Sequence, residues 1–235
     1  MVTKSVKAVI FDLDDTLYDR NAVLIEFARH LFRYLPHVFV GLEVEAVISA
    51  YLETDRSAEE DYGAGSPWTR DELSGCFLRS LGISENHTDA VTELYNRDRN
   101  KIHLPVPGAI ATVKEIRKGF QTALITGSFS VVQSPKLKAI GLLNSFDCTV
   151  FGEEFGIVKP DPEIFRHTAS LLGRSPSECL YIGDSYQLDV TGSKNAGMLA
   201  CWYNPKKAPP PELSDVRSDF VIESLPELVS ILCPD

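Results

Sequence analysis

Short segments with strand character alternate with amphipathic segments along most of this chain, and this alternation constrains the fold more than any other feature. The first segment, residues 6–11, is apolar and β-branched and predicts a buried strand. Comparable short segments recur after residue 109, separated by stretches with helical periodicity: residues 120–126, 147–152, 179–183, 199–204 and 219–224. Strands that alternate with helices pair in parallel, so we expect an α/β fold with a doubly wound parallel sheet and helices on both faces.

Residues 20–103 interrupt this series directly after the first strand, and no strand pattern is found among them. Four segments there have helical character: residues 20–36, 42–53, 69–82 and 88–103. The third opens with Thr69 and Glu72, which have the spacing of a capping box at a helix start. We therefore predict a core made of residues 1–18 and 105–235, and an inserted helical domain at residues 19–104.

Composition and charge argue against several classes of function. The 235 residues carry a formal net charge of −10 at pH 7, whereas non-specific nucleic-acid binding needs a basic surface. No apolar run approaches the roughly 18 residues of a membrane span, and the first residues do not form a signal peptide. The five cysteines are scattered without a CxxC pair, so we expect no zinc site, no disulfide framework and a cytoplasmic setting. Both a monomer and a homodimer are compatible with this size.

Polar residues follow several predicted strands, at the edge of the sheet where α/β proteins bind ligands. Four separate segments supply them: Asp12, Asp14, Asp15 and Asp19 after the first strand, Thr126 and Gly127 after the second, Lys159 before a helix, and Asp184 with Asp189 after a later strand. Carboxylates that converge in this way do not all stay ionised unless a cation joins them. A small set of oxygen ligands is typical of Mg²⁺, which keeps several of its waters, so we predict Mg²⁺ as the cofactor.

The same residue types suit phosphoryl transfer. A carboxylate beside a metal ion can attack a phosphoryl group and form an aspartyl phosphate. A second carboxyl two residues along can protonate the leaving oxygen and afterwards activate water. A lysine and a hydroxyl on the phosphoryl oxygens stabilise negative charge in the transition state. We give Asp15 and Asp19 no catalytic role, and we expect Asp161 to cap the helix that it opens.

Four motifs in this order resemble those of the haloacid dehalogenase superfamily. They are DLDDT at residues 12–16, TGS at 126–128, the lysine of KPDP at 159–162 and GDSYQLD at 183–189. The resemblance covers nearly the whole chain, and it is to phosphatases with a helical cap of the C1 type inserted after the first motif. It implies a Rossmann-like core and a Mg²⁺-dependent phosphatase acting on a small phosphomonoester such as a nucleotide, a sugar phosphate or a phosphoglycolate-like compound. The stretch DLDDTLYD looks most like the branch that contains pyrimidine 5′-nucleotidases.

The resemblance also implies roles for the residues of the first motif. Asp12 matches the nucleophile, and its second oxygen would bind the metal. Asp14 matches the general acid and base, with its backbone carbonyl on the metal. Thr16 would orient this pair and belong to the substrate-binding set.

The later motifs imply the remaining roles. Thr126 and the Gly127 amide match the groups that bind phosphate, and Lys159 matches the lysine that holds both the nucleophile and the phosphoryl group. Asp184 matches a metal ligand, and Asp189 an acid that supports the waters of the metal or the lysine.

The sequence departs from the family pattern at two positions and leaves alternatives open. Leu188 stands where family members often carry Asn, and Pro135 must start or kink the helix that follows the second motif. A phosphomutase would share every catalytic residue. A 2-haloacid dehalogenase needs no metal and typically lacks the second acid of the first motif, and a non-catalytic binding protein would have no need of it.

Overall fold

The computed structural model describes residues 5–63, 65–212 and 215–233, and it divides into two compact units. The first unit contains the residues up to Asp19 together with those from Pro105 onward, and the second is Arg20–Leu104. Within the first unit the two crossing segments are paired, since Tyr18 forms an antiparallel bridge with Pro105. The amide of Val106 also donates to the carbonyl of Leu17 at 3.0 Å.

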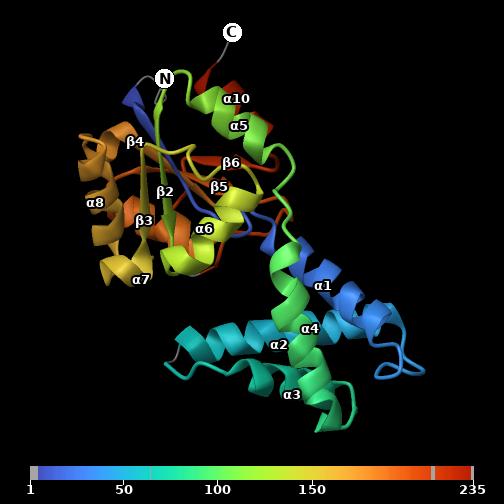
Figure 1. Cartoon of the computed structure of the whole chain (residues 1–235). Coiled ribbons are helices and arrows are strands. Elements are labelled where there is room, and N and C mark those ends of the chain that lie inside the picture. The colour runs from blue at the N-terminus through green and yellow to red at the C-terminus, as the bar shows by residue number, and fades with distance from the viewer. Residues whose placement is uncertain (1–4, 64, 213–214, 234–235) are drawn as a thin grey trace. The chain divides into compact units, whose positions relative to one another are not determined.

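The first unit is built on a parallel sheet (Figure 1). Its strands are β1 (Ala8–Phe11), β2 (Gln121–Thr126), β3 (Cys148–Phe151), β4 (Cys179–Gly183), β5 (Leu199–Tyr203) and β6 (Phe220–Ile222). They lie in the order β3-β2-β1-β4-β5-β6, and every neighbouring pair is parallel. The predicted doubly wound α/β fold is therefore confirmed. The strand order reverses at β1, between β2 and β4, which is the place where such sheets bind ligands.

Helices cover both faces of this sheet. They are α5 (Ala109–Ile116), α6 (Ser130–Ala139), α7 (Gly152–Phe155), α8 (Pro162–Leu171), α9 (Gly192–Asn195) and α10 (Pro226–Leu232). Helix α10 lies beside α5, whereas α8 packs on β2 and β3 (Figure 1). Under α8, Phe165 meets the ring of Tyr181 edge-on at a centroid distance of 4.9 Å. Asp161 caps α8 by accepting from the amide of Glu163, as predicted.

The second unit is helical and has a core of its own. It contains α1 (Arg20–Tyr34), α2 (Val44–Gly63), α3 (Arg70–Ser80) and α4 (Thr88–Asp98), with 3₁₀ turns at Glu85–His87 and Arg99–Lys101. Its apolar faces pack together around Phe27, Tyr51 and Phe77. The predicted capping box at Thr69 and Glu72 is present at the start of α3. Among the helices described here, none is long and apolar enough to cross a membrane.

Two helical segments of the first unit depart from a regular α-helix without internal proline. Pro135 lies inside α6 rather than at its start, because the helix already begins at Ser130. The segment after β4 is a π-helix, Tyr186–Thr191, that continues into the short helix α9. Irregular helical turns of this kind often accompany functional sites.

Candidate active site

Asp12 leaves the sheet at the carboxyl end of β1 and is only 6% exposed. Its amide donates to the carbonyl of Ile182 on β4 at 2.9 Å, which fixes where the side chain starts. The chain then turns sharply, since the amides of Leu17 and Tyr18 both donate to the carbonyl of Leu13. Within this turn Asp15 has a φ of 58°, a left-handed conformation that aspartate tolerates better than most residues. The turn presents the side chain of Asp14 toward α6.

Lys159 lies at the centre of the site, with a side chain that is only 7% exposed. Its ammonium donates to Asp12 Oδ1 at 2.5 Å, to Asp189 Oδ1 at 2.7 Å and to the Tyr181 hydroxyl at 3.2 Å. Burial alone lowers the pKa of a lysine, but the nearby Asp12, Asp189 and Tyr181 outweigh it and raise the pKa of Lys159 well above its usual value. Lys159 is therefore a fixed positive charge between two carboxylates.

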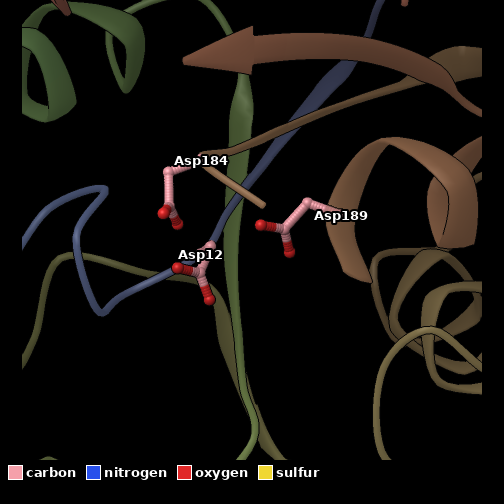
Figure 2. A group of neighbouring side chains, drawn as sticks. All are labelled: Asp12, Asp184 and Asp189. Atoms are coloured by element: carbon pink, nitrogen blue, oxygen red, sulfur yellow. The ribbon is translucent and has the colours of Figure 1, made fainter. Parts of the chain in front are cut away.

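Three carboxylates gather at this site, Asp12 after β1 and both Asp184 and Asp189 after β4 (Figure 2). One oxygen from each of Asp12, Asp184 and Asp189 lies within 4.8 Å of the others. Burial raises the pKa of Asp12 well above its ordinary value; Lys159 opposes this shift, and Asp189 and Asp184 add to it. Burial, followed by Asp189 and Asp15, raises the pKa of Asp184 to about 7. Acids that resist ionisation in this way would be relieved by a divalent cation among them, so the donor set fits Mg²⁺.

Asp189 is held tightly by the turn that follows β4. It is only 1% exposed, and its Oδ2 accepts from the amide of Ser185 at 2.9 Å. The approach to the strand is so close that a Cβ on Gly183 would lie 2.3 Å from Asp189 Cγ. Glycine at position 183 thus makes room for the carboxylate, which is a steric requirement that no spacing rule in the sequence reveals.

The second motif reaches the same edge of the sheet. Strand β2 pairs with β1 so that Leu124 is opposite Phe11, and Thr126 and Asp12 therefore leave neighbouring strands at their carboxyl ends. Thr126 is buried, and the next residue, Gly127, accepts the amide of Glu153 on its carbonyl at 3.1 Å. This contact ties the turn after β2 to the start of α7.

Thr16 and Asp14 have different surroundings, although they share one motif. The Thr16 hydroxyl donates to Asp184 Oδ1 at 3.4 Å, which links the first and last motifs. The carboxylate of Asp14 is not part of the three-acid cluster and instead accepts hydrogen bonds from two residues of α6. These residues are Gln133 and Lys136.

Three residues that the motifs do not include bind side chains of the predicted set through their own side chains: Gln133, Lys136 and Tyr181. The spacing of Gln133 and Lys136, three positions apart, places both on one helical face, and this was the available signal. Tyr181 gave no signal, because an aromatic residue inside a buried strand is typical of a core position.

Comparisons with known proteins agree with this arrangement. The model of the haloacid dehalogenase-like hydrolases matches residues 6–197, and the chain belongs to this family. The predicted family and the predicted hydrolase class are thereby confirmed. The chain is 33% identical to the glyceraldehyde 3-phosphate phosphatase of Methanopyrus kandleri, with 97% of each protein covered. It is 27% identical to the pyrimidine 5′-nucleotidase YjjG of Escherichia coli, over 96% of this chain and 97% of that protein.

Solved structures give the same result for the fold. The magnesium-bound structure of YfnB from Bacillus subtilis is similar with a TM-score of 0.77 and 25% identity, over 97% of this chain and 99% of that one. A 2-haloacid dehalogenase from Pseudomonas syringae is similar with a TM-score of 0.59 and 25% identity, over 97% and 98% of the two chains. The phosphatase names of the sequence relatives support hydrolysis of a phosphomonoester rather than dehalogenation.

Proposed function

We propose that this protein is a Mg²⁺-dependent phosphatase that hydrolyses a small phosphomonoester through an aspartyl phosphate on Asp12. The observation that carries the proposal is the position of Lys159, which binds Asp12 and Asp189 beside the acid Asp184. A nucleophilic carboxylate, an adjacent ammonium and a third acid are the groups that transfer of a phosphoryl group requires. The phosphatase names of the curated relatives support the same reaction.

The proposed reaction has two phosphoryl-transfer steps. In the first, an oxygen of Asp12 attacks phosphorus, the bond to the leaving oxygen breaks, and Asp14 gives that oxygen a proton. In the second, water attacks phosphorus while Asp14 accepts its proton, and the bond between Asp12 and phosphorus breaks to release inorganic phosphate. Lys159, the Thr126 hydroxyl and the Gly127 amide hold the phosphoryl oxygens during both steps.

We assign Asp12, Asp184 and the backbone carbonyl of Asp14 to the metal, and Asp189 supports the waters of the metal or Lys159. Bound Mg²⁺ would supply positive charge to the phosphoryl oxygens. Thr16 keeps Asp184 in place through its hydroxyl, which is 3.4 Å from Asp184 Oδ1. Asp189 orients Lys159 and, through it, Asp12.

The substrate class is a small phosphorylated metabolite, such as a nucleotide, a sugar phosphate or a phosphoglycolate-like compound. We propose that residues 1–18 and 105–235 form the catalytic core, and that residues 19–104 act as a cap that excludes water and sets specificity. The scattered cysteines support a cytoplasmic enzyme.

The test is phosphate release from a panel of small phosphomonoesters, with Mg²⁺ and with excess chelator. We expect release that stops reversibly on chelation, and release that is abolished by Asp12→Asn while the fold, followed by circular dichroism, stays intact. Near-normal turnover of Asp12→Asn would contradict the nucleophile assignment. Turnover that persists in chelator would contradict the metal requirement and favour the metal-free chemistry of a dehalogenase.

A further inference from the structure

Two residues of α6 hold the carboxylate of Asp14 by both of its oxygens. Lys136 Nζ donates to Oδ1 at 2.7 Å, and Gln133 Nε2 donates to Oδ2 at 2.9 Å. The two donors are three residues apart, so they lie on the same face of the helix. A carboxylate held at both oxygens is fixed in position and in rotation. Each oxygen still has a further lone pair that can accept another hydrogen bond.

The side chain of Lys136 is itself largely buried. Its side chain is 15% exposed, and its ammonium lies 5.2 Å from the centre of the Tyr18 ring. Tyr18 is fully buried and pairs through its backbone with Pro105. Ordering a lysine side chain costs conformational entropy, which an exposed lysine avoids by staying in water. At Lys136 the ion pair with Asp14 offsets this cost.

A separate observation indicates that Gln133 also serves to hold Asp14. The residue is 3% exposed, and its Oε1 is buried with no hydrogen-bond partner among the described residues. An unpaired buried oxygen is destabilising, and an apolar side chain of similar size would avoid this penalty. What the amide adds at this position is a donor for Asp14, which an apolar side chain lacks.

We propose that Lys136 and Gln133 are positioning residues that hold Asp14 where it exchanges its proton with the leaving group. This inference rests on the proposed phosphatase function and deepens it. A general acid works only when its oxygen is within hydrogen-bond reach of the atom that it protonates. Helix α6 follows directly after Thr126 and Gly127, so one segment places both the phosphate-binding turn and the residues that orient the acid.

Positioning of Asp14 has a kinetic effect that a purely structural role of Lys136 and Gln133 would not have. An alkyl phosphate has a poor leaving group and needs a proton from Asp14, whereas p-nitrophenyl phosphate has a good leaving group and needs little help. The value of kcat/KM reports phosphoryl transfer to Asp12 and not the later hydrolysis step, so the comparison isolates the step in which Asp14 acts as an acid. A misplaced Asp14 therefore lowers kcat/KM for the alkyl ester selectively.

The experiment measures kcat/KM for the best alkyl phosphate and for p-nitrophenyl phosphate in the wild-type enzyme and in Lys136→Met. We expect a loss of about tenfold or more on the alkyl ester and of less than about threefold on the aryl ester, because general acid catalysis contributes roughly a hundredfold or more. Lys136→Arg keeps the charge and should restore most of the alkyl activity. Lys138→Met, which removes an exposed lysine of the same helix, should leave both values unchanged.

Gln133→Leu is the second variant, with no charge change and similar volume. It should show the same selectivity with a smaller loss, because a neutral donor contributes less than a charged one. Equal losses on both esters in the two variants, or no loss in either, would overturn the inference while leaving the phosphatase assignment intact. A wild-type enzyme that releases phosphate from neither ester would instead overturn the proposed function and the inference together.

Discussion

Replacement of Lys159 by methionine tests whether this lysine compensates the buried acids. The substitution keeps the length of the side chain and removes the charge that binds Asp12 at 2.5 Å and Asp189 at 2.7 Å. Removing one partner of a buried ion pair typically costs about 3–5 kcal/mol, because the other charge stays buried without compensation. Since Asp12 already resists ionisation, it takes up a proton in the variant, so we expect about 3 kcal/mol, the lower end of that range.

The assay is urea denaturation of the core in chelator, at neutral pH. The protein has two tryptophans, Trp68 in the helical unit and Trp202 on β5, so a Trp68→Phe background leaves Trp202 as the reporter of the core. The environment of Trp202 suits this use, because the residue is 7% exposed and its Nε1 donates to the carbonyl of Asp184 at 2.8 Å. Added Mg²⁺ should recover part of the loss, because a bound cation replaces the missing charge.

The matched control is Lys194→Met. Lys194 also forms an ion pair in the core unit, with Asp219 at 2.8 Å, but both side chains are partly exposed at 28% and 25%. Pairs in such positions contribute about 0–1 kcal/mol. If Lys159→Met lowers the free energy of unfolding by no more than Lys194→Met does, the central compensating role of Lys159 is refuted.

Two further predictions concern the same cluster. Gly183→Ala should lower the free energy of unfolding by about 1–3 kcal/mol through overpacking, since the new Cβ would lie 2.3 Å from Asp189 Cγ. The control Gly119→Ala should be near neutral, because a Cβ there meets no atom within 4 Å. Equal denaturation midpoints of the two variants would contradict this prediction. Calorimetric Mg²⁺ affinity should weaken by about tenfold or more for each pH unit as the pH falls below 7. Asp184, with a pKa raised to about 7, must lose its proton to bind the metal, so a pH-independent affinity between pH 5 and 8 would refute the assignment.

The fold could be predicted from the sequence because its signals are local. The β-branched segments and the helices between them follow from hydrophobic periodicity, and the caps at Thr69 and Asp161 follow from side-chain chemistry. The carboxyl edge of a parallel sheet then brings Asp12 and Asp184 together without any further information.

The remaining features of the site depend on tertiary geometry. The contacts of Gln133 and Lys136 with Asp14 depend on how α6, which begins at Ser130, is rotated about its axis beside the first motif. The close approach of Asp189 to Gly183 needs the π-helix, whose formation no periodicity rule predicts. The contacts of α6 with Asp14 join segments far apart in the chain, and the close approach of Asp189 to Gly183 depends on the path of the backbone between them, so the spacing of residues in the sequence reveals neither.

The most direct test of the account is chemical trapping of a phosphorylated Asp12. The enzyme is mixed with its best phosphomonoester and Mg²⁺, quenched in acid during turnover, and reduced with borohydride, which converts an aspartyl phosphate to homoserine. Peptide mass spectrometry should then find homoserine at position 12 in the wild-type enzyme, and none at that position without substrate. Rapid phosphate release with an unmodified Asp12 in every quenched sample would contradict the account.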